Sequence, residues 1–235
     1  MTRRRWIADE AANDRAALVG AQAEHLAGVL RARIGQEFDI AAAGRVRRGR
    51  IISVTPDRVE FELGEELPAP LLPAITLVMA VFKFDRMEWA IEKVTELGVA
   101  WLVPLIAQRT DARLASAAAK RAERWRRIAR QAAQQSRRSA PPEISTPARL
   151  LDVLELAADR RIVLSEAEDR VSLKQAIAGS SGTVALAVGP EGGWTGEEER
   201  AFYKHGWIPA SLGPTILRTE TAAIAAVCVV LGEMT

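Results

Sequence analysis

The sequence predicts an α/β protein in which a small β-barrel precedes a parallel sheet covered by helices on both faces. Short stretches of alternating apolar and polar residues fill residues 1–67, whereas strand and helix patterns alternate after residue 74. Between them, residues 67–73 contain three prolines in seven positions, which favours extended backbone and cannot continue a helix. We therefore expect two domains, residues 1–70 and 74–235, with the boundary near residues 68–74.

The N-terminal domain is expected to be a small barrel with one helix. Turn signals separate its expected strands, which are 15–20, 37–40, 50–54 and 58–63. Residues 23–31 indicate a helix, because Leu26, Val29 and Leu30 share one face at helical spacing. We expect His25 to start or pack against this helix, since no nucleophile is spaced near it.

The C-terminal domain is expected to alternate strands and helices. The expected strands are 75–81, 99–103, 161–165, 183–188 and 207–212. The expected helices are 85–97, 120–138, 195–205 and 218–231, with a further helix after Pro147 and a short one after Ser172. Asp85 with Glu88, and Thr195 with Glu198, form capping-box patterns.

The last expected helix is nearly all apolar. This uniformity indicates burial on most sides, either inside the domain or against a second copy of the chain. Cys228 lies within this helix and is most simply a buried small hydrophobic residue.

Composition and charge narrow the class of protein. Residues with hydrophobic side chains make up 49% and charged residues 26%, which is typical of soluble globular proteins. No apolar run reaches membrane-spanning length and no signal-peptide core follows the N-terminus, so we expect a cytoplasmic location. One Cys and two His indicate neither a disulfide framework nor a metal site.

Positive charge is concentrated in two windows of the chain. Residues 1–50 and 109–138 together carry a formal charge of +12, against about −10 for the remainder. Segregated basic surfaces favour a polyanionic partner, of which RNA or DNA is the leading kind. Solvated helix faces are the alternative explanation for each window.

Two glycine–proline loops at the ends of consecutive strands form the main candidate site. The first is Gly189-Pro190-Glu191-Gly192-Gly193 and the second begins at Leu212-Gly213-Pro214. Glycine lets the backbone take positive φ or approach a ligand closely, although an ordinary strand–helix turn is the alternative. Neither loop has the pattern of a P-loop or of a dinucleotide fingerprint. The carboxylates of Glu191 and Glu220 would suit a ligand with positive charge, such as a sulfonium or an ammonium.

These loops resemble the signature motifs of the RsmE family, bacterial methyltransferases that make N3-methyluridine in small-subunit (16S) ribosomal RNA. The matching blocks are Gly189 to Gly193, Leu212-Gly213 and Ile216-Leu217-Arg218-Thr219-Glu220-Thr221-Ala222, with further agreement at residues 88–99 and 134–138. The resemblance covers nearly the whole chain. It implies a PUA-like RNA-binding barrel and a SPOUT-class catalytic domain with a C-terminal trefoil knot. It also implies S-adenosylmethionine as methyl donor and a homodimer.

With this resemblance, each group of candidate residues acquires an expected role. The expected cofactor-binding residues are Leu164, Glu166, Gly189, Pro190, Glu191, Gly192, Leu212, Gly213, Ile216 and Leu217. The expected RNA-binding residues are Arg31, Arg109, Arg137 and Arg138. Arg218 is expected to stabilise the negative charge that develops when uracil N3 loses its proton. Glu220 is expected to orient Arg218 or to act as the base, and a simple ion pair that caps the final helix is the alternative.

Three other functions remain to be compared with this one. One is a catalytically idle RNA-binding or ribosome-assembly factor with the same fold. Another is a related RNA methyltransferase that acts on a different nucleotide. A nucleotide-binding oxidoreductase is disfavoured, because the dinucleotide fingerprint is absent. The intact loops and Arg218 favour an active methyltransferase.

Overall fold

The computed structural model describes residues 5–68 and 72–234, and its chain forms two compact units. Unit 1 comprises Met1–Leu71 and Ala133–Pro141, and unit 2 comprises Leu72–Ala132 and Pro142–Thr235. The division lies within the predicted boundary at 68–74, although residues 69–71 are outside the described residues. Assignment of residues 133–141 to unit 1 was not predicted, because they continue directly from α3, most of which belongs to unit 2.

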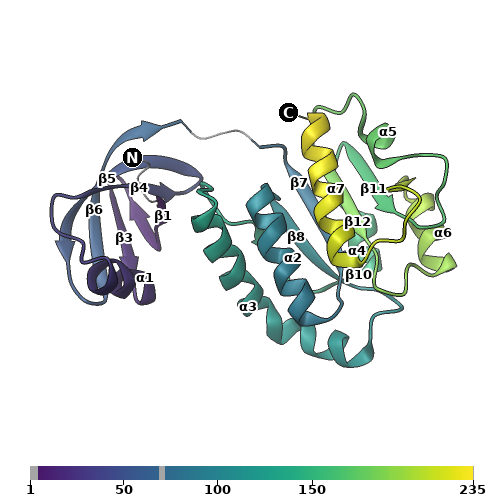
Figure 1. Cartoon of the computed structure of the whole chain (residues 1–235), viewed down its shortest axis with the longest axis horizontal. Coiled ribbons are helices and arrows are strands. Elements are labelled where there is room, and N and C mark those ends of the chain that lie inside the picture. Colours follow the sequence, from purple (N-terminus) through teal and green to yellow (C-terminus); the bar gives the residue numbers. More distant parts are fainter. Residues whose placement is uncertain (1–4, 69–71, 235) are drawn as a thin grey trace. The chain divides into compact units, whose positions relative to one another are not determined.

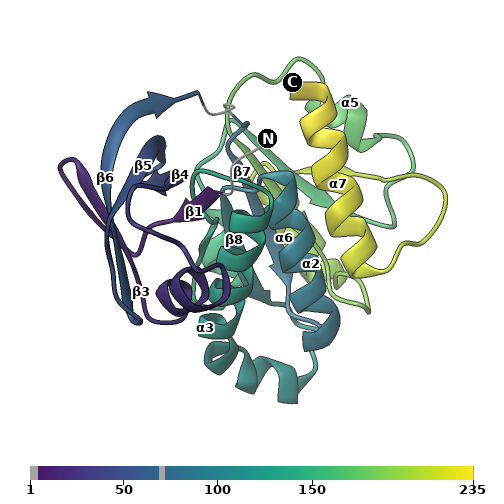
Figure 2. The same cartoon turned by 60° about the vertical axis from the view of Figure 1, so that its left-hand side comes forward.

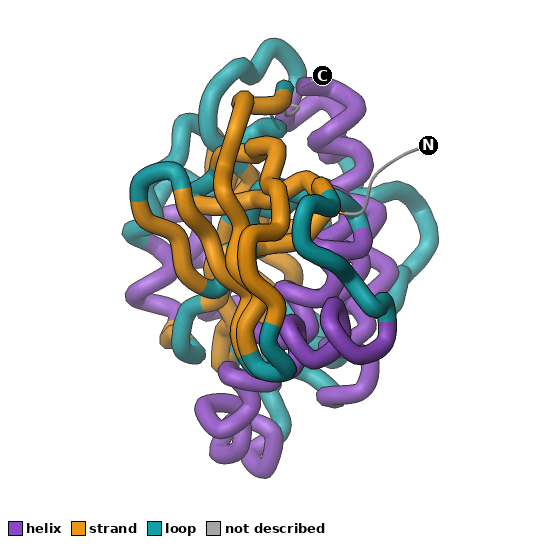
Figure 3. Tube along the Cα trace, turned by 90° about the vertical axis from the view of Figure 1, so that its left-hand side faces the viewer, coloured by secondary structure: helices purple, strands orange, loops and turns teal. Residues whose placement is uncertain are grey.

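Unit 1 is organised by a six-stranded sheet with the strand order β1-β4-β5-β6-β3-β2. Figure 3 draws these strands in orange, together with the strands of unit 2. The strands are β1 (Arg5–Ile7), β2 (Glu10–Ala12), β3 (Arg15–Val19), β4 (Glu37–Ala42), β5 (Arg45–Val54) and β6 (Arg58–Leu67). Except for the parallel pair β1 and β4, neighbouring strands are antiparallel. The sequence did not predict β1 and β2, because three residues carry too little alternation to be recognised.

The helical segment of unit 1 differs from the prediction. A short helix, α1 (Ala21–Glu24), continues into a π-helical turn, η1 (His25–Val29). Leu26 is fully buried, but Val29 and Leu30 are 68% and 41% exposed, so the three residues do not lie on one common face as predicted. The N–H of Leu30 donates to the carbonyl of His25, five residues earlier, and this wider turn rotates the last two side chains off the α-helical face.

Unit 2 contains the expected parallel sheet, with the strand order β10-β8-β7-β12-β11-β13 and β9 paired with β8 (Figure 1). The strands are β7 (Ile75–Ala80), β8 (Trp101–Ile106), β9 (Glu143–Ile144), β10 (Ala148–Arg149), β11 (Arg160–Leu164), β12 (Val184–Val188) and β13 (Ile208–Ala210). Each pair in this sheet is parallel. The two-residue strands β9 and β10 were not predicted.

Helices pack on both faces of this sheet, because successive side chains of a strand point to opposite sides (Figure 2). In β12, Val184, Leu186 and Val188 enter one core, whereas Ala185 and Ala187 enter the other. The first core includes residues of α2 (Phe84–Leu97), α3 (Ala112–Gln135), α5 (Leu173–Ile177) and α7 (Thr219–Met234). The second includes residues of α4 (Leu150–Leu154) and α6 (Gly196–Lys204).

The start of α2 corrects one capping prediction. The helix begins at Phe84, its N-cap is Lys83, and no side chain caps it, so the Asp85–Glu88 capping box is wrong. The carboxylate of Glu88 instead accepts a hydrogen bond from Nε of Arg124 at 2.7 Å. Glu88 therefore binds an arginine of α3 instead of capping the start of its own helix.

The bounds of α3 also differ from the predicted residues 120–138. The helix begins at Ala112, because Oδ1 of Asp111 accepts the N–H groups of Arg113 and Leu114 at 2.8 and 3.3 Å. It ends at Gln135, and Arg137 then adopts a left-handed backbone with φ of 59°. The buried face around Trp125 and Ala129 is as predicted.

The most apolar helix, α7, is buried along one face within this chain. Ala223, Ala226, Val227 and Val230 are fully buried, whereas Cys228 is exposed. The interpretation of Cys228 as a buried residue is therefore wrong for the single chain. Across residues 5–68 and 72–234, no helix combines the length and apolarity that crossing a membrane requires.

The predicted capping box at the start of α6 is confirmed. Oγ1 of Thr195 accepts the N–H of Glu198, and Oε2 of Glu198 accepts the N–H of Thr195 at 2.9 Å. The other carboxylate oxygen, Oε1, accepts the N–H of Gln108 at 2.8 Å. Glu198 is 1% exposed, so one buried carboxylate joins the β8–α3 loop to the start of α6.

Replacing Glu198 with alanine should lower the free energy of unfolding by about 2–4 kcal/mol, because two backbone N–H groups lose a charged acceptor in a buried position. Chemical denaturation of unit 2 is the measurement. Glu197→Ala is the matched control, since Glu197 is the exposed neighbour in the same helical turn and should change stability by less than about 0.5 kcal/mol. Equal losses for the two variants would contradict the structural role of Glu198.

Candidate functional site

A cavity of about 370 Å³ lies in unit 2 where three loops meet. Its lining comes from residues 164–167 at the end of β11, 188–190 and 192–194 at the end of β12 and 211–217 before α7, together with Arg109, Glu199, Thr219 and Ala222. The size falls within the roughly 300–1,000 Å³ that small-molecule sites span. The two glycine–proline loops selected from the sequence thus share one cavity.

Nine of the ten residues predicted to bind the cofactor line this cavity. They are Leu164, Glu166, Gly189, Pro190, Gly192, Leu212, Gly213, Ile216 and Leu217. Glu191 is not on the lining, and its carboxylate lies 3.7 Å from Nη1 of Arg86. The structure therefore brings the predicted loops together, while the cofactor-binding roles of individual residues stay predictions.

Trp194 fixes the distance between two of the loops. Its indole N–H donates to the carbonyl of Leu164 at 2.9 Å, and its ring packs edge-on against Phe202 with centroids 5.0 Å apart. A Cβ atom at Gly189 would lie 3.1 Å from the indole, closer than an ordinary contact, so a larger residue there would require the ring or the loop to shift. The sequence analysis did not select Trp194, although its place directly after two glycines was a usable signal.

Arg109 holds the carbonyl side of the first loop. Its Nη1 donates to the carbonyls of Gly192 at 2.7 Å and Trp194 at 3.1 Å. Gly193, between them, has φ of 69°, a conformation that favours glycine. Arg109 was selected as an RNA-binding residue, but these donors are engaged with the protein and its side chain lines the cavity.

The two predicted catalytic residues have different surroundings. Arg218 is exposed, and in the described part of the chain no hydrogen bond or ion pair engages its guanidinium. Glu220 is 7% exposed, and its Oε1 lies 3.5 Å from Nη1 of Arg86. Its Oε2 is buried and has no hydrogen-bond partner among the described residues. Glu220 is thus paired with Arg86, which the sequence analysis did not select, and not with Arg218.

The charges on and beside the cavity favour a ligand with a positive group. Glu166 and Glu199 contribute two carboxylates to the lining against the single guanidinium of Arg109, whose Nη1 points to the carbonyls of Gly192 and Trp194. A positively charged group would be attracted by the two carboxylates. In the described ranges, no group of three or more acidic, His or Cys side chains is arranged to hold a metal ion.

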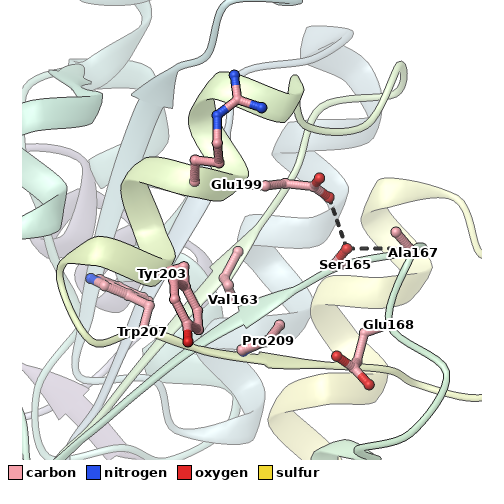
Figure 4. Close-up of a pocket in the computed structure, with 9 residues that line it drawn as sticks. Val163, Ser165, Ala167, Glu168, Glu199, Tyr203, Trp207 and Pro209 are labelled. Carbon is pink, nitrogen blue, oxygen red and sulfur yellow. Dashed lines mark hydrogen bonds between the residues drawn. The ribbon is translucent and has the colours of Figure 1, made fainter.

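A second cavity of about 280 Å³ adjoins the first, and Figure 4 shows the residues that line this second cavity. The hydroxyl of Ser165 donates to Glu199 at 2.9 Å, and both residues line both cavities. Beyond this pair the second cavity is bounded by the ring of Tyr203 and by Glu168. Backbone N–H groups of the 168–171 turn donate to Glu168 and hold the pKa of its carboxyl below the usual range.

The remaining RNA-binding candidates belong to unit 1. Arg31 and Arg137 are exposed and have left-handed backbones, with φ of 51° and 59°. Burial lowers the pKa of the Arg138 guanidinium to about 10, so this side chain is less available at the surface. The sequence did not predict that residues 137 and 138 would join the N-terminal unit, and the RNA-binding roles stay predictions.

Comparison with known proteins gives consistent results. Residues 69–231 match the model of the RNA methyltransferase domain family. The chain is 32% identical to ribosomal RNA small subunit methyltransferase E of Aquifex aeolicus over 83% of this chain and 85% of that protein. It is 30% identical to the Bacillus subtilis protein of the same name, over 88% and 86% of the two chains.

A solved structure extends the similarity to three dimensions. The ribosomal RNA small subunit methyltransferase E of Neisseria gonorrhoeae, bound to S-adenosyl methionine, superposes with a TM-score of 0.80 at 28% identity. The superposition covers 96% of this chain and 95% of that one. The similarity therefore extends over residues of both units.

Proposed function

This chain belongs to the RsmE family of RNA methyltransferases, and we propose that it transfers the methyl group of S-adenosylmethionine to N3 of a uridine in small-subunit ribosomal RNA. The observation that carries the proposal is the cavity formed by the three loops after β11, after β12 and before α7. The choice of uridine N3 rests on the family. The choice of donor also rests on the lining of the cavity.

The residues of the cavity fit S-adenosylmethionine. When bound, this donor supplies an electrophilic methyl group on a positively charged sulfur. Glu166 and Glu199 place negative charge in the cavity, while Leu212, Ile216 and Leu217 offer apolar contacts for a planar base. Glycine at 189 and 192 keeps side chains out of the approach to the backbone.

Arg218 is our candidate for stabilising the acceptor. Loss of the N3 proton spreads negative charge over the neighbouring carbonyl oxygens of uracil, and a fixed cation stabilises that state more than neutral uracil. Arg218 directly follows the cavity loop, precedes the first residue of α7 and has an unengaged guanidinium in the described structure. Its planar, permanently charged fork of donors suits this role.

Architecture and assembly complete the proposal. From the family we place unit 2 in the SPOUT class with a C-terminal trefoil knot and regard unit 1 as a PUA-like RNA-binding barrel. Three loops of unit 2 that share one cavity and a six-stranded sheet in unit 1 are consistent with this assignment. We also propose a homodimer. The support is the outer face of α7, where Ile224, Ala225 and Leu231 are only partly buried and Cys228 is exposed. A second copy would cover this apolar surface.

Gly192→Val should weaken binding of S-adenosylmethionine by at least about tenfold, because branched methyl groups would enter the cavity. A Cβ at this position would lie 3.5 Å from Cδ of Arg109, an ordinary contact, so the variant should fold. Isothermal titration calorimetry with S-adenosylmethionine is the measurement. Gly232→Val is the control, since a Cβ there meets nothing within 4 Å, and parental affinity in Gly192→Val would refute the placement.

Arg218→Ala should keep donor affinity within about threefold and reduce the transfer rate at least about a hundredfold, because the charge on the acceptor loses its stabilising cation. Mass spectrometry of nucleosides from small-subunit RNA incubated with the protein and donor measures N3-methyluridine directly. Arg170→Ala removes a similarly exposed arginine of the same unit as a control. Failure of the parental protein to form N3-methyluridine would reject the proposed reaction, and normal turnover by Arg218→Ala would remove only Arg218 from it.

RNA binding should weaken steeply as salt concentration rises, because arginines that contact phosphates displace condensed counterions. Arg31→Ala should make the slope of log affinity against log salt shallower by about one unit. Arg58→Ala is the control, since its guanidinium already pairs with Glu10 and Glu60. Fluorescence anisotropy with a labelled small-subunit RNA fragment measures both slopes, and a salt-independent affinity would contradict phosphate contacts.

A further inference from the structure

Arg86 lies close to two acidic residues to which the reaction proposed above gives no joint role. It lies in the first turn of α2, and its Nη1 is 3.7 Å from Oε1 of Glu191 and 3.5 Å from Oε1 of Glu220. Glu191 belongs to the loop after β12, and Glu220 to the first turn of α7. One nitrogen atom thus bridges three elements that are far apart in the sequence.

The surroundings of the bridge make the charge of Arg86 important. Glu220 is 7% exposed, and its Oε2 has no hydrogen-bond partner in the described residues. A buried carboxylate without a cation is strongly unfavourable, so loss of the arginine would force Glu220 or its helix to shift. The Arg86 side chain is 34% exposed, so the ion pair is only partly shielded from water.

Two arginines hold the loop after β12, one through backbone carbonyls and the other through a carboxylate side chain. Arg109 binds backbone carbonyls of Gly192 and Trp194, whereas Arg86 binds the side chain of Glu191. The N–H of Gly193 donates to the carbonyl of Pro190 at 2.9 Å, which closes a turn around Glu191. Pro190, Gly192 and Gly193 line the cavity and Glu191 does not, so Arg86 anchors the turn through its one residue outside the lining.

We propose that Arg86 is a positioning residue of the donor site, which fixes the turn at Glu191 to Glu220 at the start of α7 and thereby sets the affinity for S-adenosylmethionine. The identity of this ligand rests on the function proposed above. Arg86 itself touches no reacting atom in this proposal, because its action passes through the two glutamates.

The geometry predicts which substitution can replace Arg86. Both contacts use the same atom, Nη1, so the bridge needs a point charge and makes no use of the planar fork. Lysine should therefore restore most of the effect, whereas methionine, with similar bulk and no charge, should not. A bidentate arginine site would show the opposite behaviour.

The first measurement is amide hydrogen exchange in the protein without ligand. In Arg86→Met the Gly193 N–H should exchange at least about tenfold faster, since release of Glu191 opens the turn. Arg86→Lys should stay near the parental rate. Lys93→Met is the matched control, because Lys93 lies on the same helix, bridges Glu92 and Glu96 and is similarly exposed, at 31%.

The second measurement is calorimetric titration with S-adenosylmethionine. Arg86→Met should weaken binding about tenfold, with Arg86→Lys and Lys93→Met within about threefold of the parent. If Arg86→Met does not fold, Glu191→Gln removes the same anchor without leaving a buried charge alone, and it should raise both the exchange rate and the dissociation constant.

Several results would overturn the proposal. The first is an unchanged exchange rate of the Gly193 N–H and an unchanged affinity for S-adenosylmethionine in Arg86→Met. The second is that Lys93→Met changes both quantities as much as Arg86→Met does. If Arg86→Met does not fold, parental values of both quantities in Glu191→Gln overturn the proposal. If Arg86→Lys has the same exchange rate and affinity as Arg86→Met, a single positive charge is not sufficient to bridge the two glutamates. If the parental protein binds no S-adenosylmethionine, the proposed donor is wrong, and the exchange of Gly193 still decides whether Arg86 anchors the turn.

Discussion

The hydrogen bond from the indole of Trp194 to the carbonyl of Leu164 is the contact on which the site depends. It joins the loop that follows β12 to the end of β11, while the same ring packs on Phe202 of α6. The bond alone contributes about 1 kcal/mol, but burial of the ring adds roughly 2–3 kcal/mol and fixes its direction. Glycine at position 189 suits this arrangement, because a Cβ atom there would lie 3.1 Å from the ring, closer than an ordinary contact.

Charged residues around this contact hold the loops in place before any ligand arrives. Glu198 joins the β8–α3 loop to the start of α6, and Arg109 extends from that loop to the carbonyls of Gly192 and Trp194. Arg86 performs the corresponding task at Glu191 and Glu220. A preorganised site of this kind loses less conformational entropy on binding than a mobile one. Arg218 is exposed, and among the described residues no hydrogen bond or ion pair engages its guanidinium, so this framework leaves its charge available.

Predictions from the sequence succeeded where the deciding interaction was local. Thr195 and Glu198 cap α6 as expected, because their partners are three residues apart. Gly98 follows the apolar stripe of α2 directly in the sequence and ends the helix with φ of 106°, a conformation that favours glycine. The Asp85–Glu88 capping box failed, since Arg124 of another helix engages Glu88. The prediction that Leu30 shares a helical face with Leu26 was also wrong. A π-helical turn displaces Leu30, and the spacing of apolar residues in the sequence does not indicate such a turn.

The sequence by itself determined the parallel sheet of unit 2, the two glycine–proline loops and the residues that resemble the RsmE family, because each follows from neighbouring residues or from a short motif. The tertiary structure alone decided which charges meet. It paired Glu220 with Arg86, turned Arg109 toward the loop carbonyls and assigned residues 133–141 to unit 1. The physical reason is that an ion pair or a buried contact depends on distance in space. Spacing along the chain fixes that distance only within a helical turn or a strand.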